Sequence, residues 1–122
     1  MNPRRVQTGI LLWLPVLLWC GVIFVLSSIP HLRLFKEDLL DFIVRKTAHM
    51  VEYGVLARLL ARALTGSTFW SWKKIFAWSL ALSLLYSLTD EYHQTYVAGR
   101  QGSPRDVVID TLGAWLALGL KP

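Results

Sequence analysis

The segment from Gly9 to Ile29, GILLWLPVLLWCGVIFVLSSI, carries no charged side chain. About 20 apolar residues are enough for a helix to cross the roughly 30 Å hydrocarbon core of a bilayer. Pro15 is tolerable there, because membrane helices accommodate kinks. The apolar run is long and VLSSIPH offers no small-residue cleavage site, so we expect a retained anchor rather than a cleaved signal peptide.

The composition agrees with a membrane protein of one domain, residues 1–122. The chain is 54% hydrophobic and contains six tryptophans, which is too apolar for an ordinary soluble domain of this size. The net charge of +5 does not indicate nucleic-acid binding, because no basic residues cluster on a soluble-looking face. Cys20 is the single cysteine, so no intrachain disulfide can form.

Three further apolar segments have helical periodicity, although they are more polar than the first. Ser103 is suited to cap the last of them, and Pro104 suits its first turn. In that segment Gly113 and Ala117 form a small-xxx-small surface for close helix contact. We therefore expect an all-α integral membrane protein with four transmembrane helices, at about 9–29, 46–64, 75–94 and 104–120.

The connector between the first two segments, residues 30–45, mixes apolar and charged side chains in PHLRLFKEDLLDFIVR. This pattern favours a short amphipathic helix on the membrane surface. A re-entrant or packed loop is the alternative.

The basic residues suggest an orientation for these spans. One side of the membrane would hold Arg4, Arg5, Arg58, Arg62, Lys73, Lys74 and Lys121. The other side would hold Arg33, Lys36, Arg45, Lys46, Arg100 and Arg105. The second set is mixed with acids beside polar helix faces, which suggests a site. We therefore expect a multi-pass protein with both termini in the cytoplasm and the polar cluster toward the outside.

Polar side chains converge at the outer ends of the last three helices. At 100° per residue, Lys46, His49, Glu52 and Tyr53 share one face of their helix. Asp90 and His93 share a face of the next, and Glu91 points about 100° away. The candidate site comprises Lys46, His49, Glu52, Tyr53, Asp90, Glu91, His93, Gln94, Arg100, Arg105, Asp106 and Asp110. Ionisable residues inside a membrane span are costly and usually functional.

Four of these residues, His49, Glu52, Asp90 and His93, are candidates for acid/base catalysis or for metal ligation. A buried hydrogen-bond and ion-pair network that only fixes the bundle is the alternative. The spacing does not decide whether a metal binds, and we expect no cofactor. Ser87 is a candidate nucleophile, although serines in membrane helices more often bond to neighbouring helices.

The basic residues of the site, Lys46, Arg100 and Arg105, suit a phosphate or carboxylate ligand. They could instead neutralise acids inside the bundle. Asp106 lies in the first turn of its helix, where a negative charge is favourable. Asp110 lies deeper and should be paired, with Arg100, Lys46 or His93 as candidates.

The order of these motifs resembles the VanZ-like family of bacterial membrane proteins over nearly the whole chain. The match begins with LSS at 26–28 and the Lys-x-x-His-x-x-Glu-Tyr run at 46–53. It continues with Asp90-Glu91, His93-Gln94, Gly99-Arg100, Asp106, Asp110 and Gly113. The resemblance implies a small multi-helix protein of the bacterial cytoplasmic membrane, and the family's name member is associated with resistance to the glycopeptide teicoplanin. It implies no reaction.

Taken together, these features favour a site that binds or modifies an anionic cell-envelope component. The partners that we expect are membrane lipids and an anionic envelope precursor or lipid head group, with homo-oligomer formation as a further option. Whether the protein is an enzyme stays open. The alternatives are an intramembrane hydrolase or transferase on a lipid-linked substrate, a small transporter or flippase component, and a purely structural polar network.

Overall fold

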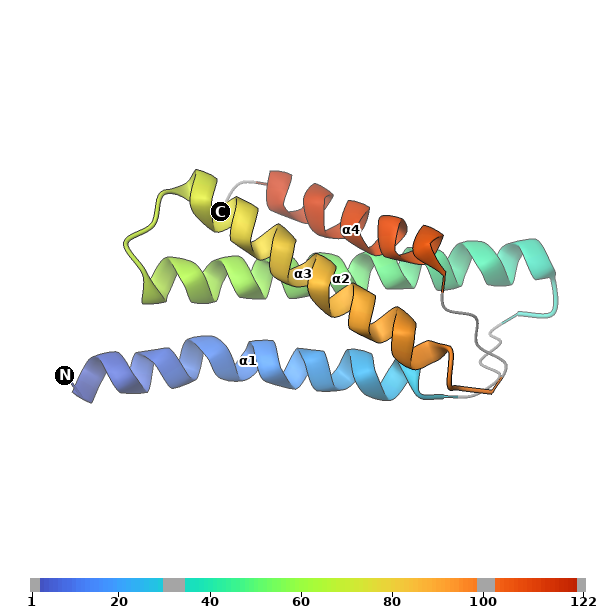
Figure 1. Cartoon of the computed structure of the whole chain (residues 1–122), viewed down its shortest axis with the longest axis horizontal. Coiled ribbons are helices and arrows are strands. Elements are labelled where there is room, and N and C mark those ends of the chain that lie inside the picture. Colours follow the sequence, from blue (N-terminus) through green and yellow to red (C-terminus); the bar gives the residue numbers. More distant parts are fainter. Residues whose placement is uncertain (1–2, 30–34, 99–102, 121–122) are drawn as a thin grey trace.

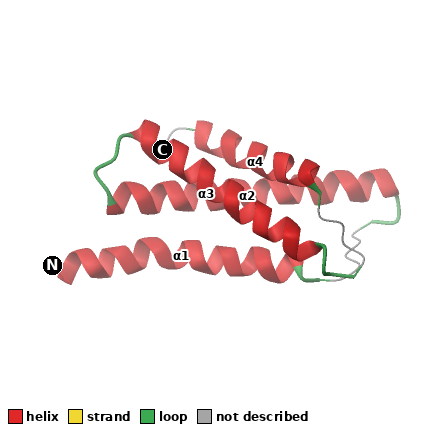
Figure 2. Cartoon of the chain, in the orientation of Figure 1, coloured by secondary structure: helices red, strands yellow, loops and turns green. Residues whose placement is uncertain are grey.

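The computed structural model describes residues 3–29, 35–98 and 103–120, and these residues form four α-helices and no strand (Figures 1 and 2). The helices are α1 (Pro3–Ser27), α2 (Asp38–Ser67), α3 (Trp72–Gln94) and α4 (Pro104–Gly119). The expected all-α class and the number of helices are confirmed.

Successive helices run in opposite directions, so the end of α1, the start of α2, the end of α3 and the start of α4 lie at one end of the bundle (Figure 1). We call this the polar end. Within the described residues, α2 contacts each of the other helices, whereas α1 and α4 do not contact each other. Figure 1 shows why, because α2 lies between them and α3 crosses over it.

The second helix begins at Asp38 rather than near Lys46. The prediction of a separate amphipathic helix or loop is therefore wrong for residues 38–45, which form the first two turns of α2. No glycine or proline interrupts this stretch, and Asp38 and Asp41 supply favourable negative charge in the first turn. Arg45 Nε lies 2.8 Å from Asp41 Oδ2, one turn away. Residues 30–34 of the connector lie outside the described residues.

Side-chain caps define where α3 and α4 begin. The backbone N–H of Lys74 donates to Ser71 Oγ at 3.4 Å. The backbone N–H of Asp106 donates to Ser103 Oγ at 3.3 Å, and Pro104 opens the helix. The predicted cap and start of α4 are confirmed. They place Asp106 in the first turn of this helix, at the polar end of the bundle.

Two apolar clusters hold the bundle together. The first joins α1 to α2 through Leu12, Val16, Ile23, Tyr53, Leu56, Leu60 and Ala63. The second joins α2, α3 and α4 through Ala57, Ala61, Leu64, Ile75, Ala114 and Leu118. The second cluster is rich in alanine, which allows α2 and α4 to approach closely.

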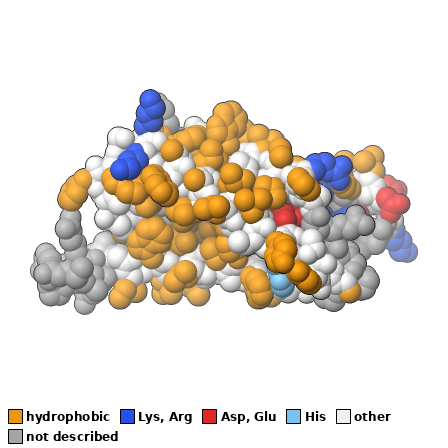
Figure 3. All heavy atoms as spheres, viewed as in Figure 1, with side chains coloured by type: hydrophobic (Ala, Val, Ile, Leu, Met, Phe, Trp, Pro, Cys, Tyr) orange, Lys and Arg blue, Asp and Glu red, His pale blue; other side chains and the backbone are white. Residues whose placement is uncertain are grey.

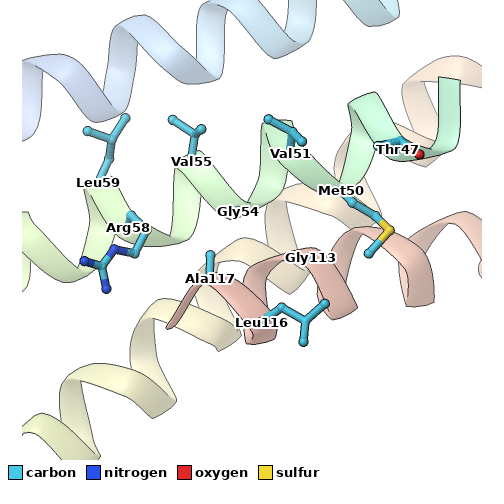
Figure 4. Close-up of a pocket in the computed structure, with 10 residues that line it drawn as sticks. All are labelled: Thr47, Met50, Val51, Gly54, Val55, Arg58, Leu59, Gly113, Leu116 and Ala117. Carbon is cyan, nitrogen blue, oxygen red and sulfur yellow. The ribbon is translucent and has the colours of Figure 1, made fainter. Parts of the chain in front are cut away.

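Two glycines lie where α2 and α4 meet (Figure 4). A Cβ atom on Gly113 would lie 2.3 Å from the carbonyl oxygen of Met50, and one on Gly54 would lie 3.3 Å from Ala117 Cβ. The small-xxx-small surface predicted for Gly113 and Ala117 is confirmed, and α2 is its partner. An apolar groove of about 510 Å³ follows the same seam (Figure 4).

Hydrogen bonds from aromatic side chains also connect α1 to the rest of the bundle. Trp13 Nε1 donates to Ser67 Oγ at 2.9 Å, and Trp19 Nε1 donates to the carbonyl oxygen of Glu52 at 2.8 Å. Tyr86 OH donates to the carbonyl oxygen of Cys20. These bonds attach α1 to both α2 and α3.

Many hydrophobic side chains lie on the face of the bundle that Figure 3 shows. Large hydrophobic side chains are exposed on every helix, for example Leu17, Val51, Leu85 and Trp115. By length and composition, one helix in the described part of the chain qualifies as a membrane span, over Thr8–Ser27. The other three expected spans do not reach that criterion. With 16 residues α4 is too short, and charged and polar side chains make α2 and α3 less apolar than α1.

The glycine at position 113 should be required for the α2–α4 contact. We expect Gly113→Ala to lower the free energy of unfolding by about 2 kcal/mol, because the atoms that its Cβ meets belong to the backbone of Met50 and cannot swing aside. Gly21→Ala is the matched control, since no atom lies within 4 Å of its Cβ position. Thermal unfolding in detergent would measure both, and equal midpoints would contradict the close contact.

Candidate functional site

Four acidic side chains of α3 and α4 are buried toward the polar end of the bundle. Asp90 and Glu91 come from α3, and Asp106 and Asp110 come from α4. Three side chains of α2 face them, namely Lys46, His49 and Tyr53. The structure thus brings together seven of the twelve residues that the sequence predicts for the site. We call these seven residues the polar cluster.

The outermost contact of the cluster is the ion pair between Lys46 Nζ and Asp106 Oδ1. The Lys46 side chain is 18% exposed and that of Asp106 is 8% exposed. The lysine is therefore the side of the pair that solvent reaches. Asp106 is also in the first turn of α4, where the helix dipole favours its charge.

One turn deeper, His49 and Ser87 both contact Asp110. His49 Nδ1 lies 3.2 Å from Asp110 Oδ1, and Ser87 Oγ donates to Asp110 Oδ2 at 2.8 Å. Asp110 is fully buried. The sequence correctly predicts that it is paired, but its partners come from α2 and α3. Lys46 contacts Asp106 instead, and His93 lies elsewhere.

The third contact joins α2 to α3. The fully buried Tyr53 donates from its hydroxyl to Asp90 Oδ2 at 3.0 Å. Ser27 of α1 is buried beside the same carboxylate. Through Ser27, the end of α1 therefore adjoins the polar cluster. The LSS motif at 26–28 is the sequence signal for this position.

Glu91 completes the cluster from the side of α3 that the sequence did not favour. Its Oε2 accepts from the backbone N–H of Ser103 at 3.2 Å, just before α4 begins. Its Oε1 is buried and has no hydrogen-bond partner in the described part of the chain. Donor atoms of His49, Glu91 and Asp110 lie within 4.8 Å of one another.

His93 does not join His49. Its ring stacks on Phe24 of α1, with the ring centroids 4.6 Å apart, and its Nε2 lies 3.0 Å from Ser28 Oγ. The structure therefore does not bring Asp90, His93, His49 and Glu52 together as one set of ligands, because His93 faces α1. Asp90 and His93 turn toward different neighbours, although one helical turn separates them.

The remaining predicted residues have other surroundings. Glu52 is half-buried, and its backbone carbonyl accepts from Trp19. Gln94 is buried, and its Nε2 has no partner among the described residues. Arg105 is exposed, with its guanidinium 5.5 Å from the centre of the Phe42 ring. Arg100 lies outside the described residues.

The serine stripe of α3 faces the interior of the bundle. Ser79, Ser83 and Ser87 are buried, and the hydroxyls of Ser79 and Ser83 have no hydrogen-bond partner in the described segments. The helices of one chain close this stripe, which weakens the alternative of a transport path between chains. Ser87 donates to a carboxylate and not to a histidine, so its contacts are not those of an activated nucleophile.

Charge is unevenly distributed in the cluster. Within the polar cluster, four buried carboxylates face one lysine, Lys46, and one histidine, His49, which is charged only when it is protonated. Burying unpaired carboxylates is costly. The site therefore favours positive charge, whether that charge arrives as protons or as a bound cation.

The fold and the site define a small helical protein with a buried polar cluster and, within the described residues, one helix long and apolar enough to cross a membrane. The VanZ/LLP1 family model matches residues 12–121, so the protein belongs to the VanZ/LLP1 family. This confirms the resemblance carried by the sequence motifs. Comparisons with curated proteins and with solved structures gave no match.

The bond between Tyr53 and Asp90 should show as an energetic coupling. We expect Tyr53→Phe and Asp90→Asn each to cost about 1–3 kcal/mol in the free energy of unfolding. The first removes the hydrogen bond, and the second replaces its charged acceptor by a neutral amide. The double variant should cost clearly less than the sum. Trp13→Phe with Asp90→Asn is the control pair, since Trp13 bonds to Ser67 near the other end and should be additive. Additivity in both pairs would contradict the coupling.

Proposed function

We propose that this protein is a multi-pass protein of the bacterial cytoplasmic membrane that binds an anionic cell-envelope component at the polar end of its bundle. The family and the apolar α1 support a membrane location. The apolar outer surface of all four helices supports the further spans. α4 would span a thinned bilayer, because 16 residues extend about 24 Å as a helix.

The observation that carries the proposal is a pair of cations around one aromatic ring. Lys46 Nζ and the Arg105 guanidinium each lie 5.5 Å from the centre of the Phe42 ring. Both belong to the outer part of the site, and the acids lie behind them. An approaching phosphate or carboxylate would therefore meet Lys46 and Arg105 first. The exposed apolar ring of Phe42 suits the lipid part of such a ligand.

The buried acids have a supporting role in this proposal. Asp106 holds Lys46 in place, so its ammonium group need not be ordered when the ligand binds. Teicoplanin-type resistance would follow if the bound component were the envelope precursor that the glycopeptide recognises. A lipid head group is the other source of the same chemistry.

Binding should depend on the two outer cations. We expect Lys46→Ala and Arg105→Ala each to weaken binding of vesicles that contain phosphatidylglycerol by about tenfold, since each removes a charge-assisted contact. Lys74→Ala is the matched control, because Lys74 lies 4.3 Å from the centre of the Trp70 ring at the opposite end of the bundle. Vesicle co-sedimentation with lipid-linked envelope precursor in a parallel arm separates the two ligand sources.

The same variants test the link to resistance. We expect the wild-type protein and Lys74→Ala to raise the teicoplanin concentration that a susceptible bacterium tolerates, and Lys46→Ala and Arg105→Ala to lose the effect. If all variants are expressed equally and protect equally, the cluster is structural and the proposal fails.

The proposed topology gives a separate test. Alkaline phosphatase is active only outside the cytoplasm, so a fusion after Val97 should be active and one after Leu120 inactive. The opposite pattern would place the polar end in the cytoplasm and exclude an extracytoplasmic ligand.

A further inference from the structure

We propose that His49, Glu91 and Asp110 form a binding site for a divalent transition-metal ion of the Zn²⁺ class. The three residues come from α2, α3 and α4, so the ion would join all three helices at one point. This site is deeper than the Lys46–Arg105 pair and does not depend on the envelope ligand proposed above.

The donor atoms are already close to the arrangement that such an ion needs. They lie within 4.8 Å of one another, and His49 Nδ1 is 3.2 Å from Asp110 Oδ1. Two ligands of a tetrahedral ion at 2.0–2.2 Å lie about 3.4 Å apart. Small rotations of the side chains would therefore close the site.

Each carboxylate has one oxygen held by a group outside the site. Of the other two oxygens, Glu91 Oε1 has no hydrogen-bond partner in the described part of the chain, and Asp110 Oδ1 contacts His49 Nδ1, which would give up its proton to ligate the ion. Ser87 donates to Asp110 Oδ2, and the backbone N–H of Ser103 donates to Glu91 Oε2. Hydrogen bonds of this kind orient the ligands in metal sites. The Ser87 hydroxyl and the backbone N–H of Ser103, at the start of α4, would thus hold both carboxylates in place before an ion binds.

Glu91 provides a second, independent observation that points to a bound cation. Its side chain is buried, and its Oε1 has no hydrogen-bond partner in the described part of the chain. A buried carboxylate oxygen without a partner is costly. A cation beside it would remove that cost, and it would also offset the excess of acids over Lys46 and His49.

The kind of ion follows from the donors. One imidazole nitrogen with two carboxylate oxygens suits zinc and related transition metals better than Ca²⁺ or Mg²⁺, which prefer oxygen ligands alone. Three protein ligands leave a coordination position for water or a ligand atom. The two positive charges of the ion would balance the negative charges of Glu91 and Asp110.

The test measures metal directly on the purified protein in detergent, carrying an affinity tag without histidine. After treatment with a chelator and desalting, Zn²⁺ is added, and the bound ion is measured by elemental analysis and by calorimetry. We expect one zinc ion per chain. His49→Ala should lose affinity by more than the tenfold to hundredfold typical of an outer-shell change, and Ser87→Ala by about tenfold.

His93→Ala is the matched control, because this histidine stacks on Phe24 away from the cluster and should leave zinc binding unchanged. Glu91→Gln keeps the side-chain size and serves if His49→Ala does not fold. Less than one-tenth of an ion per wild-type chain would overturn the site, as would unchanged affinity in Glu91→Gln or equal loss in His93→Ala. Lys46→Ala and Arg105→Ala should keep the zinc, so failure of the envelope proposal would be distinguishable.

Discussion

The approach of α4 to the backbone of α2 is the constraint on which the polar cluster depends. Gly113 lies against Met50, and these residues are neighbours of the pair Asp110 and His49 on the same two helices. A larger side chain at Gly113 would move the helices apart and lengthen the distance between imidazole and carboxylate. The close contact between the two backbones therefore sets the distance across which the charged side chains of the cluster meet.

Much of this arrangement follows from residue spacing. The uncharged run of α1, the Ser103 cap and the Gly113–Ala117 surface each have a local cause, and each was predictable. The shared face of Lys46, His49 and Tyr53 also follows from helical periodicity. Local patterns succeed there because one helix fixes the relative directions of its own side chains.

The errors concern relations between helices, which periodicity does not determine. Asp90 and His93 share a face of α3, yet Asp90 turns to Tyr53 and His93 to α1. Glu91, which points away from that face, reaches the start of α4. The crossing of α3 over α2 decides which neighbour each side chain meets, and no local sequence pattern encodes that crossing. Residues 38–45 carry charges like those of a surface connector, so their pattern does not indicate that they begin α2.

The aromatic hydrogen bonds of α1 have a consequence for its register. Trp13, Trp19 and the carbonyl of Cys20 bond to three different residues of α2 and α3 along the length of α1. A shift of α1 by one residue would replace each bonded residue by its neighbour, which points about 100° away around the helix. All three bonds would then be lost together. These bonds thus fix both the rotation of α1 about its axis and its position along the bundle. Only in that position do Ser27 and Ser28 lie beside the residues of the polar end.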